Sequence, residues 1–223
     1  MFPSTAITAK NNGMRAVRWI IALAVIAGIC WLFPLFHVVP LKAAKAEKAA
    51  AEFNAEQFAE TFWTNQLLPS LDKTVNADVL LATIQSDPAE AKKKFSRSLG
   101  FSSTYFYFVS GTGRVVSISD DEISLAITSG STNAEVTLLC GLIFGDAVRD
   151  GTGLLNASTY PNSQDFNDIS AALNHLVETR VLPGLREQAK VGSQISFAGC
   201  AEVDDEAMDL KPLKVIPIQT KTP

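Results

Sequence analysis

The chain has 223 residues, of which 47% are hydrophobic and 19% are charged. This balance is typical of a protein with a folded core and excludes an intrinsically disordered chain. The formal net charge is −4 and no basic stripe follows the N-terminal region, so the sequence gives no support to nucleic acid as a partner.

The N-terminus predicts an attachment to a membrane. Residues 1–18 form a basic tail with Lys10, Arg15 and Arg18, and residues 19–41 follow as an apolar run without a fixed charge. A run of about 20 apolar residues can cross a bilayer as one helix and exceeds the hydrophobic part of an ordinary signal peptide. We therefore expect residues 19–41 to be a membrane anchor or signal segment, with the bulk of the chain outside the cytoplasm.

Two other fates of this segment stay open. Cleavage after Ala46, where Ala44-Lys45-Ala46 fits an A-x-A site, would release a soluble protein. Cys30 could carry a lipid, although the residue before it, Ile29, is not the small residue that a lipoprotein site has. Without a lipid, Cys30 is one more apolar residue of the helix.

Residues 42–99 are expected to form a stalk and a small helical subdomain. The first part is rich in Ala, Glu and Lys, which favour a helix, and Pro69 is expected to end or kink it. A second helix is expected to begin after Asn76 as its N-cap. A third is expected after Asp87, with Pro88 at its first position.

Residues 100–223 show the alternating aromatic and β-branched pattern that is typical of strands. Three strands are expected first, then a helix near residues 164–179 that Pro183-Gly184 ends, then two more strands. This is the element order of an OB-like fold. The predicted fold class is therefore α+β: an N-terminal anchor helix, a helical subdomain, and a five-stranded OB-like β-barrel with a helix between strands 3 and 4.

The connection between the third strand and that helix holds the residues best suited to bind a ligand or a partner. Arg149 offers a planar fork of donors, and Asp146 and Asp150 can accept hydrogen bonds from hydroxyls. The candidate binding residues are Asp146, Arg149, Asp150, Tyr160, Asn162 and Gln164. They could hold a small sugar or polyol. The alternative is an internal network of Arg149 and Asp150, with Asn162 as a helix cap.

No recognisable catalytic or cofactor motif appears, so we expect no enzymatic activity and no cofactor. The weaker alternative is a hydrolase that uses Asp146 or Asp150 with His175, which requires these side chains to converge in one cleft. No Cys/His cluster has metal-ligand spacing, so no metal site is expected. Cys140 and Cys200 could form a disulfide outside the cytoplasm or stay two buried free thiols.

Several features together resemble a bacterial family of predicted periplasmic lipoproteins, domain of unknown function 2291. The resemblance rests on Val38-Val39-Pro40-Leu41, Phe62-Trp63, Leu67-Leu68-Pro69, Tyr105–Val116, Gly141, Gly145, Arg149-Asp150, Tyr160-Pro161-Asn162 and Leu173-Asn174. It implies a helical subdomain with an OB-like domain, located in the bacterial cell envelope on the periplasmic side of the inner membrane. It also implies association with ATP-driven (ABC-type) sugar or polyol importers, without an established activity.

The sequence departs from the family pattern at two positions. Ile29 precedes Cys30, which is unusual for a lipidation site, and Asp146 stands where a small hydroxyl residue is more usual. With the resemblance, the expected function is that of a membrane-anchored accessory protein that contacts importer subunits or their binding protein. The alternative is a direct binding module for a small hydroxylated ligand.

Overall fold

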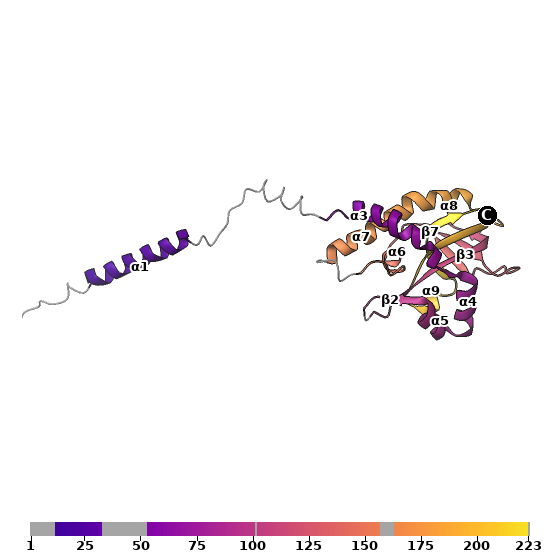
Figure 1. Cartoon of the computed structure of the whole chain (residues 1–223), viewed down its shortest axis with the longest axis horizontal. Helices are drawn as coiled ribbons and strands as arrows, with labels where there is room; N and C mark the ends of the chain where they lie inside the picture. The colour runs from indigo at the N-terminus through magenta and orange to yellow at the C-terminus, as the bar shows by residue number, and fades with distance from the viewer. Residues whose placement is uncertain (1–11, 33–52, 101, 157–162, 223) are drawn as a thin grey trace, which may run out of the picture. The chain divides into compact units, whose positions relative to one another are not determined.

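The computed structural model of the chain describes residues 12–32, 53–100, 102–156 and 163–222 (Figure 1). It divides into two compact units, residues 1–52 and residues 53–223.

The N-terminal unit contains one described helix, α1, which spans Asn12–Leu32. It begins within the basic tail and includes the first part of the apolar run, where Trp19, Ile20 and Leu23 are exposed. Among the helices that the structure describes, none combines the length and the apolar character that crossing a bilayer requires. Residues 33–41 of the expected anchor, the cleavage site at Ala46 and the side chain of Cys30 lie outside the described part of the chain.

Helices open the second unit. Their bounds are α3 Ala55–Phe62, the π turn η1 Trp63–Leu67, the 3-10 segment η2 Leu68–Lys73, α4 Ala77–Ser86 and α5 Pro88–Phe95. The expected caps are confirmed, because Asn76 Oδ1 accepts from Asp78 N at 2.8 Å and Asp87 Oδ1 accepts from Glu90 N at 3.1 Å. At Pro69 the α-helical pattern has given way to the 3-10 segment, whose first turn accepts a residue without an N–H group.

Five strands form a closed ring of pairings. Their bounds are β3 Tyr105–Ile118, β4 Glu122–Ala126, β5 Val136–Leu139, β6 Gln194–Val203 and β7 Leu213–Lys221. The ring runs β3, β4, β5, β7, β6 and back to β3, with β5 and β7 parallel and the other pairs antiparallel. The short strands β1 (Val75–Asn76) and β2 (Ser96–Ser98) also pair with β3. The expected order of three strands, a helix and two strands is confirmed.

Strand β3 is long because it pairs with two neighbours along its length. Residues 105–114 pair with β6, and residues 114–118 pair with β4. A Cβ atom on Gly113 would lie 2.9 Å from Leu125 Cβ. The missing side chain therefore lets β4 approach β3 where the partners change.

A long helical segment connects β5 to β6. After the short helix α6 (Ala147–Asp150), it runs from α7 (Ser163–Leu176) through the π turn η4 (Val177–Val181) into α8 (Leu182–Gln188). The prediction that Pro183-Gly184 ends the helix is wrong. Pro183 lies in the first turn of α8, where the missing N–H of proline is tolerated.

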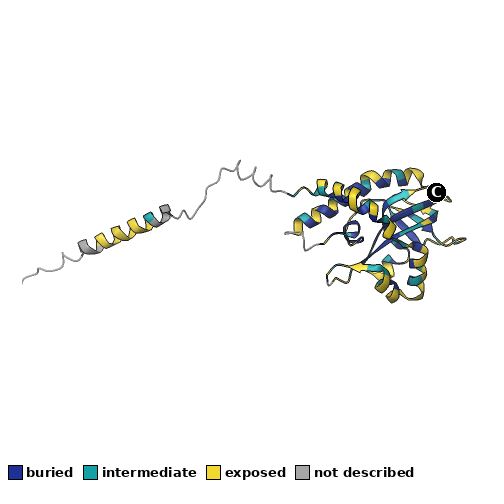
Figure 2. Ribbon diagram, viewed as in Figure 1, coloured by how far each residue is buried: buried dark blue, intermediate teal, exposed yellow. Residues whose placement is uncertain are grey.

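The helices and the strands share one core. Helix α3 packs against α7, α4 packs against β3, and their buried side chains belong to one hydrophobic cluster. Figure 2 shows buried residues on the strands and on one side of each of these helices. From residue 53 on, the helices expected as a subdomain therefore belong to the same compact unit as the strands. The short helix α9 (Glu206–Asp209) lies between β6 and β7.

Candidate functional site

A buried ion pair lies at the centre of the region that the sequence singles out. Arg149 and Asp150 on α6 are each 4% exposed, and Arg149 donates from Nε and Nη2 to the two carboxylate oxygens of Asp150, both at 2.7 Å. Arg149 Nη1 also donates to the carbonyl oxygen of Phe166, and its guanidinium lies 3.7 Å from the Phe166 ring centroid. Arg149 and Asp150 thus form an internal network that ties α6 to α7.

The loop before α6, residues 141–146, is fixed to the α7 segment by polar contacts. Ile143 N donates to Glu178 Oε1 at 2.8 Å, and Asn174 Nδ2 donates to the carbonyl oxygen of Gly145 at 3.0 Å. Gly145 has φ +83°, a left-handed conformation that glycine adopts without strain. The backbone of this loop is therefore held at several points.

This fixed loop presents two large apolar side chains to solvent. Leu142 is 75% exposed and Phe144 is 76% exposed, whereas Ile143 between them is 6% exposed. We call Leu142 and Phe144 the apolar pair. Large apolar side chains that lie exposed close together on a fixed loop are candidates for a contact surface.

A pocket of about 470 Å³ lies beside the apolar pair, and we call it the α7 pocket. Its lining includes Phe144, Asp146, Ser170, Asn174, His175 and Glu178. Asp146 accepts from Ser170 Oγ at 2.8 Å and lies 3.1 Å from Arg149 Nη2. Asn174 is 6% exposed, and its Oδ1 has no hydrogen-bond partner among the residues that the structure describes.

Glu202 on β6 contacts the start of α6, where its Oε2 accepts from Asp146 N at 3.4 Å. Burial raises the pKa of Glu202 above its ordinary value, and this effect outweighs the hydrogen bond from Asp146. The negative charges of Asp204, Asp146 and Asp150 raise the pKa further. In the folded protein the neutral form of Glu202 is therefore favoured more than in a free glutamate side chain.

The sequence-predicted site residues do not all converge. Asp146, Arg149 and Asp150 come together, whereas Gln164 donates to Asp168 on the surface of α7 at 2.7 Å. Tyr160 and Asn162 lie outside the described residues. Both carboxylate oxygens of Asp150 are held by Arg149, while Asp146 and His175 line the same pocket.

Several polar residues that line the α7 pocket were not among the predicted binding residues. Ser170, Asn174 and Glu178 recur at intervals of four along the α7 segment. This spacing places polar side chains on one face of a helix, and that signal could have found them.

Comparison with known proteins places the chain in a family. Residues 20–221 match the family described as predicted periplasmic lipoprotein (DUF2291). The chain belongs to this family. No protein among those with curated descriptions matches it.

One solved structure shows the fold that this family member adopts. It is the crystal structure of an OB-fold protein from Thermotoga maritima, with a TM-score of 0.68 and 24% sequence identity. The match covers 77% of this chain and 99% of that chain. It confirms an OB-like fold within the mixed α+β structure, and at this identity it carries no statement about activity.

The two cysteines of the second unit are buried free thiols, so the expected alternative of a disulfide is not realised. Strand β7 pairs with both β5 and β6 and so lies between Cys140, just after β5, and Cys200 on β6. The two cysteines therefore belong to strands that are not neighbours in the ring. Burial is the largest effect that raises the pKa of both thiols.

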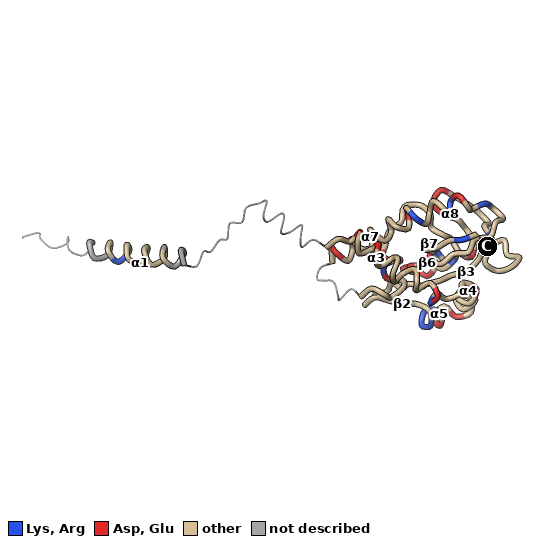
Figure 3. Tube along the Cα trace, turned by 45° about the horizontal axis from the view of Figure 1, so that its top comes forward, with Lys and Arg blue, Asp and Glu red and all other residues tan. Residues whose placement is uncertain are grey.

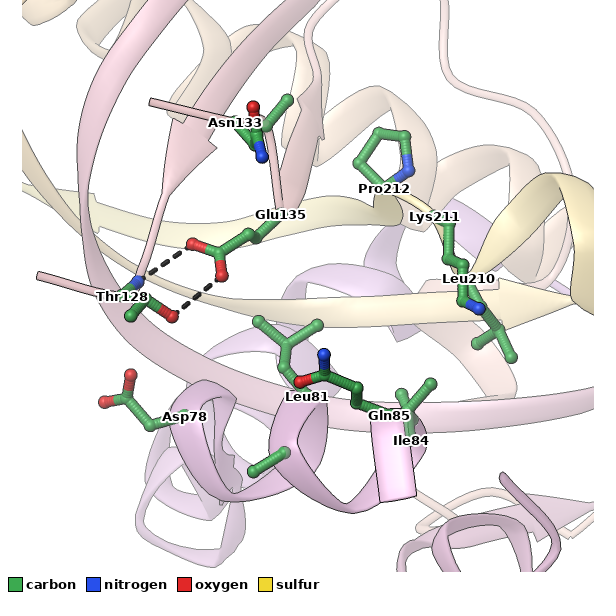
Figure 4. A pocket seen from close by; sticks show the side chains of 12 residues that line it. Asp78, Leu81, Ile84, Gln85, Thr128, Asn133, Glu135, Leu210, Lys211 and Pro212 are labelled. Carbon is green, nitrogen blue, oxygen red and sulfur yellow. Dashed lines mark hydrogen bonds between the residues drawn. The ribbon is translucent and has the colours of Figure 1, made fainter. Parts of the chain in front are cut away.

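A second pocket, of about 510 Å³, opens between α4, the β4–β5 loop and the segment before β7 (Figure 4). Asp78, Gln85, Asn133 and Lys211 bring polar groups to it. Burial alone would raise the pKa of Glu135, but hydrogen bonds from Thr128 N, Thr128 Oγ1 and Ile127 N lower it. Glu135 therefore fixes the β4–β5 loop as a charged carboxylate.

Acidic and basic residues occur on several elements of the second unit (Figure 3), with a run of Lys92, Lys93 and Lys94 on α5. No group of three or more His, Cys, Asp or Glu residues has a metal-binding arrangement within the described ranges.

Proposed function

We propose that this family member is a non-enzymatic accessory protein of the bacterial envelope that acts by binding another protein. The proposed partner is a subunit of an ATP-driven sugar or polyol importer, or its substrate-binding protein. The observation that carries this proposal is the exposure of the apolar pair, Leu142 and Phe144, on a loop whose backbone is fixed.

Exposing two large apolar side chains to water is unfavourable for an isolated protein, and their burial in an interface would recover that free energy. Hydrogen bonds from Ile143 N and to Gly145 O already order the loop, so little conformational entropy is lost on binding. Membership in a family of predicted periplasmic lipoproteins supports a partner in the same compartment.

Site-specific crosslinking in cells tests this proposal. We expect a photoreactive residue at position 142 or 144 to crosslink to an importer subunit. Val191 is also a large, exposed apolar residue, but it lies in the turn before β6 and serves as the control position. The double variant Leu142→Ser with Phe144→Ser should abolish co-purification of that subunit. Equal crosslinking from position 191, or no importer product from 142 and 144, would contradict the proposal.

A second candidate function is the binding of a small hydroxylated ligand in the pocket of Figure 4. Asp78, Gln85, Asn133 and Lys211 offer both donors and acceptors, which hydroxyl groups require, and Leu81 adds an apolar surface. A sugar or polyol at a hundred times its dissociation constant should stabilise the fold by about 2.7 kcal/mol. A thermal-shift screen measures this effect, and the Gln85→Ala variant should lose it.

A further inference from the structure

The pocket of Figure 4 contains one unpaired charged group of each sign. Asp78 lies in the first turn of α4, Lys211 lies between α9 and β7, and both residues are exposed. Among the described residues, neither side chain has an ion-pair or hydrogen-bond partner. Figure 4 shows the two side chains on opposite sides of the pocket. Single surface charges are common, but here an unpaired carboxylate and an unpaired ammonium group line the same concave site.

We propose that this pocket binds a zwitterion, a small molecule that carries an ammonium group and a carboxylate joined by a short chain. The ligand's ammonium group would donate to the carboxylate of Asp78, and its carboxylate would accept from Lys211 Nζ. The inference rests on the second candidate function, the binding of a small molecule in this pocket, and it assigns the charge of that molecule.

Glu135, the third charged residue that lines the pocket, is committed to the protein. Its Oε2 accepts from Ile127 N at 2.8 Å and from Thr128 N at 2.9 Å, and its Oε1 accepts from Thr128 Oγ1 at 2.7 Å. The charges left to a ligand are therefore one negative and one positive. This balance favours a ligand whose net charge is zero but whose two charges are separated.

The side of the pocket formed by α4 favours a ligand with a carbon chain. Asp78, Leu81 and Gln85 recur at intervals of three and four residues, which places them on one face of the helix. Leu81 thus lies between a carboxylate and an amide, and Ile84 adds further apolar surface. A ligand that contacts Asp78 and Lys211 with its two ends would bury its carbon chain against Leu81.

Both walls of the pocket are ordered without a ligand. Asn76 caps the start of α4, where its Oδ1 accepts from Asp78 N at 2.8 Å, and Glu135 fixes the β4–β5 loop on the other side. Little conformational entropy is therefore lost when the pocket is filled. Its volume of about 510 Å³ lies within the range of about 300–1,000 Å³ that is usual for small-molecule sites.

Nuclear magnetic resonance titration of the ¹⁵N-labelled full chain in detergent micelles tests the inference at constant ionic strength. The zwitterionic probes are glycine, γ-aminobutyrate and ε-aminocaproate, which separate the two charges by increasing lengths, together with diglycine and triglycine. Each probe has two singly charged controls, its N-acetyl derivative and its carboxamide. The side-chain amides of Gln85 and Asn133, which are neutral groups of the pocket, report binding. At least one zwitterion should bind about tenfold more tightly than both of its controls.

Variants of the two charged residues make the result specific to this pocket. Asp78→Asn should remove the advantage of the zwitterion over its N-acetyl derivative, because both then bind only through Lys211. Lys211→Gln should remove the advantage over the carboxamide, because both then bind only through Asp78. Asp72→Asn on η2 and Lys221→Gln at the end of β7 remove equal charges outside this pocket and should leave both advantages intact.

The outcomes separate this inference from the function on which it rests. If a neutral polyol shifts the Gln85 and Asn133 signals and no zwitterion binds more tightly than its controls, the charge assignment is wrong and small-molecule binding stands. If neither polyols nor zwitterions bind, both are wrong. Equal losses in the control variants and in the two pocket variants would also overturn the inference.

The probes also identify the source of the two charges. Tighter binding of diglycine or triglycine than of γ-aminobutyrate and ε-aminocaproate would assign the pocket to the two ends of a short peptide. The reverse order would assign it to a free amino acid. Either order supports the inference, and neither depends on the crosslinking from the apolar pair.

Discussion

At the residue scale, Arg149 is the side chain on which the geometry of the candidate site depends most. Replacing it by methionine leaves the carboxylate of Asp150 buried without its bidentate partner. Breaking a buried ion pair from one side costs roughly 3–5 kcal/mol, because the remaining charge is uncompensated. We expect Arg149→Met to lower the free energy of unfolding by this amount in urea denaturation followed by circular dichroism.

The double variant Arg149→Met with Asp150→Leu is the control for this prediction. It removes both charges, so no unpaired carboxylate stays in the core, and much of the lost stability should return. Equal losses in the single and double variants would show that packing around Phe166, and not the ion pair, holds α6 to α7.

The raised pKa of Glu202 makes the stability of the folded protein depend on pH. Its pKa in the folded protein is raised, so the folded state holds the proton more tightly than the unfolded chain. This stabilisation is complete below the ordinary glutamate pKa of about 4.3 and is lost as the pH rises through the raised pKa. Glu202→Gln stays neutral at every pH and can still accept from Asp146 N.

The melting temperatures of the two proteins should therefore agree at pH 4 and separate at pH 7.5, with Glu202→Gln the more stable. A less stable variant at pH 7.5 would mean that the folded protein favours the charged carboxylate of Glu202, which is the opposite sign.

At the element scale, the sequence predicted the beginnings of helices better than their ends. Asn76 and Asp87 could be read as caps because each bonds to a backbone N–H within three residues, which is a local interaction. Pro183-Gly184 was misjudged because its context is not local. Val181, Leu182 and Leu185 are buried around it, and this burial outweighs the low helix propensity of the two residues.

Gly184 lies within α8, and its conformation there does not require glycine. A Cβ atom there would come no nearer than 4.0 Å to a neighbour, the Gln188 side chain. We expect Gly184→Ala to raise the free energy of unfolding by about 0.5–1 kcal/mol, because alanine loses less backbone entropy in a helix.

Gly151 provides the matched contrast in the same urea measurement. A Cβ atom at Gly151 would lie 2.6 Å from the carbonyl oxygen of Ala147, a backbone atom that cannot move aside. Gly151→Ala should therefore destabilise the protein by about 1–3 kcal/mol. Changes of the same sign in both variants would contradict this account.

The candidate site was only partly predictable for a related reason. Asp146, Arg149 and Asp150 stand close in the sequence, so their proximity in space follows from the chain itself. Asn174 and Glu178 reach the same pocket only because α7 packs beside the loop, and Glu202 contacts Asp146 N from β6. Contacts between distant segments depend on tertiary packing that a single sequence does not display.

At the scale of the whole molecule, the order of strands and helix was enough to predict the OB-like fold, because few topologies accommodate that order. The division at residue 99 had no such support, since a count of elements does not say which of them share a core. In the structure, β1 and β2 pair with β3, and a Cβ atom on Gly111 would lie 2.7 Å from Ala77 Cβ on α4. The helices therefore pack directly on the ring of strands.

The shared core predicts which truncated fragments of the chain can fold. A fragment of residues 53–223 should fold without the first 52 residues and unfold cooperatively at the same melting temperature as the full chain, because it contains the complete core. A fragment of residues 100–223 should not unfold cooperatively, because it lacks Phe62, Leu67 and Leu80, which are buried in that core. Calorimetry of both fragments decides the point: a cooperative transition in the shorter one would show that the ring of strands is a domain of its own, with the helices only attached to it.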